Sequence, residues 1–69
     1  MKEIIFLIEE AIEGGFTARA LGFSIFTDAE TMVELKANIR EATRYHFDQE
    51  EDLPKVVRLH FVKDEIMAI

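Results

Sequence analysis

The apolar residues of the chain follow two different periods, and the change of period separates strands from a single helix. Between Thr31 and Phe47 they recur at steps of three and four, which places one set on a helical stripe: Met32, Leu35, Ile39, Ala42 and His46. Thr31 and Glu34 form a capping-box pattern, so the helix is predicted to begin at Thr31 and to end near Phe47 or Asp48. Four polar residues off that stripe are expected to face water: Glu34, Asn38, Glu41 and Arg44.

Four other segments have the alternation, or the β-branched and aromatic residues, that are typical of strands. They are Lys2–Glu10, Phe16–Leu21, Phe23–Thr27 and Lys55–Lys63. The first is apolar on both faces, which predicts a central strand. Glu13-Gly14-Gly15 is a turn signal between the first two segments. In the last segment the residues expected to face the core are Val57, Leu59 and Phe61.

This order of elements predicts one small α+β domain over residues 1–69, of the type βββαβ(β), with Ile66–Ile69 as the candidate fifth strand. Three strands form a meander, and the helix then returns the chain parallel to the first strand. The helix therefore packs on a mostly antiparallel sheet in which the third strand is followed by the second, the first and the fourth. One helix about 10 Å across cannot cover both faces of such a sheet.

The uncovered sheet face is predicted to bind a protein, because it combines an apolar centre with a charged rim. The residues expected at this interface are Ile5, Leu7, Arg19, Arg58, His60, Val62, Ile66 and Ile69. The alternative is an ordinary solvated sheet face. The acidic run Asp48–Asp52 adds a candidate electrostatic contact, through Glu50, Glu51 and Asp52, for which the alternative is a solvated loop.

The size of the chain also favours association. A 69-residue domain buries only about 60% of the surface that its unfolded chain exposes. It has no Cys, so disulfides cannot add stability, and oligomerisation is a common remaining route. We therefore expect a homodimer or a higher even assembly. The absence of Cys also fits the reducing cytoplasm.

The balance of charge excludes some partners. There are 14 acidic and 8 basic residues, a formal net charge of -6. This acidity opposes binding to phosphate backbones, so direct DNA binding is not expected, whereas a basic protein is a suitable partner. The longest apolar run, Ile4–Ile8, is too short to span a membrane. We therefore expect no association with a membrane.

No pattern in the chain predicts catalysis. Five carboxylates could in principle gather around a divalent cation, but they lack a ligand-loop spacing: Glu9, Glu10, Glu13, Asp28 and Glu30. A solvated acidic rim is the simpler interpretation. His46 and His60 have no nucleophile or orienting partner in the pattern. We therefore expect no enzyme activity, no metal and no cofactor.

Several short motifs resemble the HicB-like antitoxin domain, a small βββαβ module with a degraded RNase H fold. They are the apolar first strand, the segment Glu13–Ala18 that opens the second strand, Thr27–Thr31 before the helix, Glu34-Leu35 at its start, and a small residue at Ala42. The chain departs from the family at Leu21–Ser24, where a proline-rich connection is usual, and at Ala29, near the place of a usual Gly. No helix-turn-helix or ribbon-helix-helix segment follows in this sequence.

The resemblance implies a function in a toxin-antitoxin system. A HicB-like protein masks a small basic RNA-cleaving toxin of the HicA type and has no RNase H activity of its own. We therefore expect a non-catalytic protein-binding module that resembles an antitoxin. The alternative is a stand-alone homo-oligomeric structural or regulatory module of unknown ligand.

Overall fold

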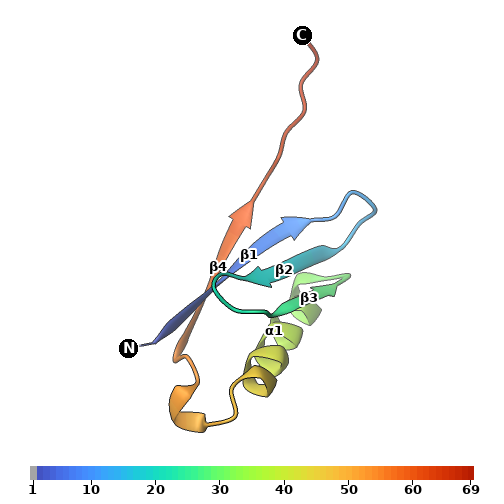
Figure 1. Ribbon diagram of the computed structural model, residues 1–69. Coiled ribbons are helices and arrows are strands. Elements are labelled where there is room, and N and C mark those ends of the chain that lie inside the picture. The colour runs from blue at the N-terminus through green and yellow to red at the C-terminus, as the bar shows by residue number, and fades with distance from the viewer. Residues whose placement is uncertain (1) are drawn as a thin grey trace.

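The computed structural model, which describes residues 2–69, is a four-stranded mixed sheet with one helix packed on one face (Figure 1). The elements are β1 (Glu3–Glu10), β2 (Phe16–Ala20), β3 (Phe26–Ala29), α1 (Met32–His46), the short 3-10 helix η1 (Glu50–Asp52) and β4 (Val56–Val62). The sheet order is β3-β2-β1-β4. β1 runs antiparallel to β2 and parallel to β4, and β2 and β3 are antiparallel. The predicted α+β fold and strand order are confirmed.

The core forms where α1 meets the alternate residues of the central strand. Ile4, Phe6 and Ile8 point to the helix side of β1 and are at most 1% exposed. Leu35 and Ile39 of α1 are buried in the same cluster. Both residues belong to the predicted helical stripe, so the period of the sequence identified the helix face correctly.

The predicted start of the helix is confirmed at atomic detail. The Thr31 hydroxyl accepts a hydrogen bond from the Glu34 amide at 3.2 Å, and it lies 3.2 Å from the Glu34 carboxylate, to which it donates. At the other end Phe47 is the C-cap, with its amide donating to the Thr43 carbonyl. These contacts satisfy groups that a helix end leaves without an intrahelical partner.

The last residue of the predicted stripe, His46, lies at its edge and is exposed. Its ring packs edge-to-face against Phe47 and Phe23, with centroids 5.0 and 5.8 Å away. Aromatic edge-to-face pairs of this kind are ordinary stabilising contacts. The three rings close the gap between the end of α1 and the loop after β2.

The predicted third strand, Phe23–Thr27, was wrong by about three residues. Gly22 adopts a positive φ of 84°, and the Ala20 amide donates to the Ile25 carbonyl at 3.0 Å. These features make residues 21–25 a turn, so that Ile25 is buried in a connection and β3 begins only at Phe26. β3 is nevertheless an edge strand, as predicted.

The predicted turn between the first two strands is confirmed. Gly14 and Gly15 both have positive φ, which residues with a side chain rarely adopt. At Gly15 a Cβ atom would also lie 2.9 Å from the Ala29 carbonyl oxygen, so the backbone of β3 approaches too closely for any other residue.

The predicted core face of β4 is buried at only one of its three residues, because the helix does not cover this strand. α1 packs against β2 and β3, and in Figure 1 it lies over that half of the sheet. Val57 and Phe61 do point to the helix side, beside Ile4 and Ile8 of β1, but they are 37% and 58% exposed. Only Leu59 of this strand packs against the core. β4 is thus an edge strand with apolar surface open to solvent.

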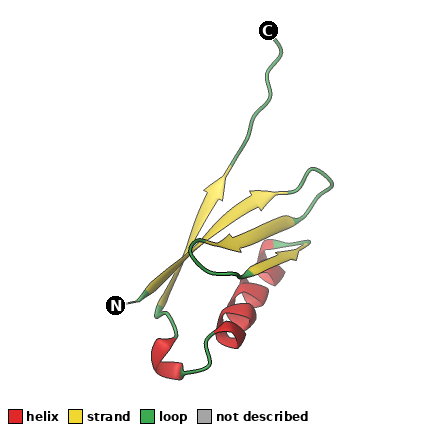
Figure 2. Cartoon of the chain, in the orientation of Figure 1, coloured by secondary structure: helices red, strands yellow, loops and turns green. Residues whose placement is uncertain are grey.

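Residues 63–69 form no fifth strand within the described part of the chain. They leave the end of β4 as an extended tail that projects away from the sheet (Figures 1 and 2). Ile66 and Met67 are 98% and 82% exposed, and Ile69 is fully exposed. The radius of gyration, 13.5 Å, accordingly exceeds the ~11 Å expected for a compact domain of this length. No helix within residues 2–69 is long and apolar enough to cross a membrane.

The core packing predicts which substitutions destabilise the fold. Leu35→Ala and Ile39→Ala should each lower the free energy of unfolding by about 2–5 kcal/mol, because each leaves a cavity beneath the helix. Val33→Ala, at an 80% exposed position of the same helix, should change it by less than about 0.5 kcal/mol. Urea denaturation followed by circular dichroism measures all three. Equal small effects at all three positions would contradict this core.

Candidate protein-binding surface

The pairing of the strands gathers the predicted interface residues on the sheet face opposite the helix. Leu7 stands at the centre of one row, directly between Arg19 of β2 and His60 of β4. Ile5 lies beside Arg58, and Val62 lies beside Glu9. Paired residues of neighbouring strands share a face, so these six predicted residues form one continuous surface, here called the open face.

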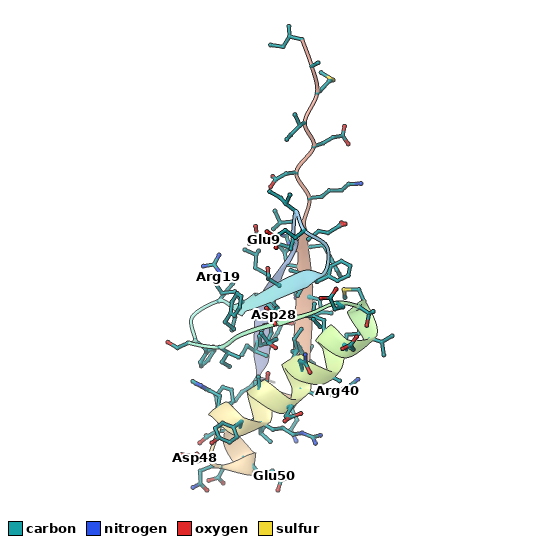
Figure 3. All side chains as sticks on the ribbon, turned by 90° about the vertical axis from the view of Figure 1, so that its right-hand side faces the viewer. Glu9, Arg19, Asp28, Arg40, Asp48 and Glu50 are labelled. Atoms are coloured by element: carbon teal, nitrogen blue, oxygen red, sulfur yellow. The ribbon has the colours of Figure 1, made fainter. Side chains whose placement is uncertain are left out.

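The burial of these side chains follows the expected anatomy of an interface. Ile5, Leu7 and Val62 are half-buried, whereas Arg19, Arg58 and His60 are exposed. In Figure 3 Arg19 points away from the side of the sheet on which the helix lies. The open face therefore has an apolar centre bordered by cationic and polar side chains, as in many protein interfaces.

One ion pair holds part of the rim in place. The Arg58 guanidinium donates a hydrogen bond from Nη2 to the Glu3 Oε2 atom at 2.9 Å, between neighbouring strands. This hydrogen bond, with the charge of Arg58, lowers the pKa of Glu3 below its ordinary value and raises the pKa of Arg58. The Arg58 side chain is 63% exposed and the Glu3 side chain 32%, so solvent screens the pair, which orients Arg58 more than it stabilises the fold.

Two predicted interface residues do not join the open face. Ile66 and Ile69 lie on the tail, which leaves the sheet beyond the end of β4. The single predicted interface is therefore two surfaces, one on the sheet and one on the tail. This separation could not be found from alternation alone, because alternation does not say where a strand loses its neighbour.

The acidic residues expected at an electrostatic contact lie at the other end of the molecule. Glu50, Glu51 and Asp52 form η1 and are all exposed. In Figure 3 the labelled Asp48 and Glu50 lie at the end opposite the tail. Asp52 is paired with Lys2, with Nζ 3.3 Å from Oδ1, which leaves Glu50 and Glu51 as the carboxylates without an ion pair in this group.

Sequence reasoning missed two residues of this region. Phe26 stands beside Arg19 on the open face and is 63% exposed, so it adds an exposed aromatic ring on the edge strand β3, beyond Arg19. It was missed because the third strand was placed too early.

Asn38 was expected to face water, but it is half-buried and its side-chain amide donates to the Asp28 carbonyl at 3.0 Å. This bond ties α1 to β3.

The carboxylates considered for a metal site remain separate. Glu9 and Asp28 share a row of the open face, but Thr17 of β2 stands between them. Two strand spacings put their backbones about 10 Å apart. Within residues 2–69 no three potential ligand side chains gather where they could hold a metal ion.

Two proteins named UPF0150 protein are similar to this chain. One, from Thermotoga maritima, is 41% identical over 68 residues, which are 99% of this chain and 94% of that protein. The other, from Archaeoglobus fulgidus, is 50% identical over 48 residues, which are 70% of this chain and 71% of that protein. No family model matches the chain, and no solved structure matches it significantly.

The ion pair on the rim predicts a measurable titration. In Arg58→Met the pKa of Glu3 should rise toward its ordinary value of 4.5, because the donor and the charge are both lost. Since the pKa of Glu3 is lowered in the folded chain, the pair stabilises above that ordinary value. Its contribution is lost as the pH falls through the folded pKa. Carboxyl NMR titration checks this, with Arg19→Met as a matched control that leaves Glu3 unchanged.

Proposed function

Because the chain belongs to the UPF0150 protein family, a name that states no activity, we propose its function from the surface just described. The chain is a non-catalytic protein-binding module that resembles a HicB-type antitoxin and neutralises a small basic RNase toxin of the HicA type. The observation that carries the proposal is the open face, where Ile5 and Leu7 form an apolar centre within a rim of exposed Arg19, Arg58 and His60.

The charge of the chain supports a basic partner. A net charge of -6 attracts a cationic protein over a distance and raises its rate of association. Glu50 and Glu51 are exposed in η1, which follows α1, and are free to meet positive side chains. Steering by these carboxylates and burial of the apolar centre are complementary, since the first affects how fast a complex forms and the second how long it lasts.

The proposal assigns the chain to the cytoplasm and gives it no chemistry of its own. A toxin that cleaves RNA acts in the cytoplasm, and a chain without Cys needs no oxidising compartment. The Glu9 and Asp28 carboxylates stand on the open face as part of its polar border. In this arrangement they keep the surface soluble and select against anionic partners.

The second candidate function is a homo-oligomeric structural or regulatory module. The observation that favours it is the exposed apolar tail, in particular Ile66, Met67 and Ile69. An apolar segment held out into water is typical of a surface that meets another protein. In this case the tail binds a second copy of the chain, and the open face is free for another ligand.

Capture from the source cytoplasm tests the first candidate. The tagged chain should retain a small basic protein whose binding weakens with salt, and purified components then give rates. Glu50→Gln/Glu51→Gln should slow association about 3- to 10-fold at low ionic strength. Glu10→Gln/Glu13→Gln changes the net charge equally at the distant β1–β2 turn and should have a smaller effect. If the wild type retains only itself, the homo-oligomeric module is the better account.

The apolar part of the same surface is tested separately. Phe26→Ser should raise the dissociation constant of the complex about 10-fold, or roughly 1.4 kcal/mol, by removing an exposed aromatic ring from the open face. Val33→Ser removes a comparably exposed apolar side chain from the helix and should leave binding unchanged. Equal loss in both variants would show that the partner does not dock on the open face.

The absence of chemistry is tested with nucleic acid substrates. The chain should not cleave an RNA–DNA hybrid in Mg²⁺ or Mn²⁺ and should not bind duplex DNA at physiological ionic strength. Gel-based cleavage and fluorescence anisotropy measure the two activities. Metal-dependent cleavage that disappears in Glu9→Gln or Asp28→Asn would show that the open face is an active site.

A further inference from the structure

Two features without partners lie on one continuous segment of the chain. The outer edge of β4 pairs with no strand in the part of the chain that the structure describes, residues 2–69. The tail, residues 63–69, then continues from β4 into solvent (Figure 1). An edge strand with free backbone groups and apolar side chains is a template for pairing with another strand. A partner that binds here therefore has to pair with the free backbone groups of β4 and cover the apolar side chains of the tail.

We propose that two copies of the chain associate by exchanging their tails along the free edges of β4. β4 and the tail of one copy run antiparallel to the tail and β4 of the other. β4 has seven residues, and the tail 63–69 is equally long, so each tail covers the edge of the partner's β4. This inference rests on the second candidate function, the homo-oligomeric module. It specifies which residues form the contact between the copies and how they are paired.

The chemistry of the segment selects the register. If the two-fold axis is perpendicular to the sheet, the α1 helices of both copies lie on the same face of the joined sheet. The strand residue at the axis then stands directly opposite the same residue of the other copy. The residues at the junction of strand and tail are Val62, Lys63 and Asp64. Lys63 or Asp64 on the axis would place like charges directly opposite each other, which is destabilising. Val62 on the axis places two β-branched apolar residues together instead.

The register centred on Val62 also matches the charges and apolar groups on both sides of the axis. Asp64 stands opposite the partner's His60 and diagonal to the partner's Arg58, which are exposed cationic or polar groups of β4. Met67 stands opposite the partner's Val57, whose side chain is 37% exposed because α1 does not reach it. The exchange thus covers apolar surface that the single copy leaves in water.

The other free edge of the sheet fits the tail less well. β3 has only four residues, and a shallow hollow of about 420 Å³ lies between its first residues, Phe26 and Thr27, and the second half of α1. The rim of this hollow includes Glu41, which does not complement the acidic start of the tail at Asp64 and Glu65. In addition, β4 and the tail form one continuous segment, so a single two-fold axis pairs each tail with the β4 edge of the other copy. A tail that paired with β3 of a second copy would not be placed by this axis.

The first test measures the oligomeric state of the full chain by light scattering and sedimentation velocity. The wild type should be a dimer at micromolar concentration. Ile66→Pro/Met67→Pro should raise the dimer dissociation constant at least ~100-fold, because consecutive strand residues direct their amides to opposite edges and one proline must remove a ladder bond. Ile66→Val/Met67→Val keeps amides and apolar side chains and should remain a dimer. At dilutions where all three proteins are monomers, both tail variants should have the melting temperature of the wild type, which shows that the substitutions do not unfold the domain.

The second test determines the register by disulfide cross-linking, which is specific because the chain has no Cys. Directly opposed strand residues have Cα atoms about 4.5–5.5 Å apart, a separation that a disulfide spans. V62C should therefore cross-link two copies at least ~10-fold faster than K63C or D64C.

The outcomes separate this inference from the proposed functions. A wild type that stays monomeric overturns both the exchange and the homo-oligomeric candidate, while the antitoxin-like candidate is judged by its own binding test. A dimer that survives the double proline substitution overturns the tail exchange but keeps self-association through another surface. Faster cross-linking of K63C or D64C overturns the register centred on Val62.

Discussion

The packing of one helix on part of a four-stranded sheet is the constraint on which the other features depend. Leu35 and Ile39 enter the core beside Phe6, at the centre of β1. The Asn38 amide holds α1 to the backbone of β3, and the small side chains of Ala18 and Ala20 let the helix approach β2. The helix is thereby fixed over β2 and β3, and a rod about 10 Å wide cannot also cover β4. Apolar residues remain in water on both faces of the sheet.

These uncovered regions differ in chemistry, and so they suit different partners. The open face mixes apolar side chains with Arg19, Arg58 and His60, which favours a partner with polar groups of its own. The edge of β4 and the tail offer main-chain donors and acceptors together with aliphatic side chains, which is what another strand requires. The acidic residues of η1 are distant from the tail (Figure 3). One copy can therefore meet another along β4 while its open face remains accessible.

The charged residues around the exposed strand limit the ways in which it can pair with another strand. Lys55 and Lys63 flank β4, and Asp64 and Glu65 separate it from the apolar residues of the tail. Charges beside an exposed strand oppose indiscriminate pairing, because a shifted or parallel neighbour places like charges together. In the proposed dimer a two-fold partner satisfies these charges in few registers, so the same residues that protect the edge would also make its pairing selective.

The sequence by itself determined the helix, three of the four strands and the order of the elements, because these depend on periods of two and 3.6 residues and on local signals such as Thr31 with Glu34 and Gly14-Gly15. It also grouped Ile5, Leu7, Arg19, Arg58, His60 and Val62 correctly, since strand pairing preserves alternation. Only the tertiary structure decided that Val57 and Phe61 stay exposed, that Phe26 joins the open face, and that Ile66 and Ile69 leave it. Those outcomes depend on where the helix lies and where β4 loses its neighbour, and both are set by contacts between residues far apart in the chain.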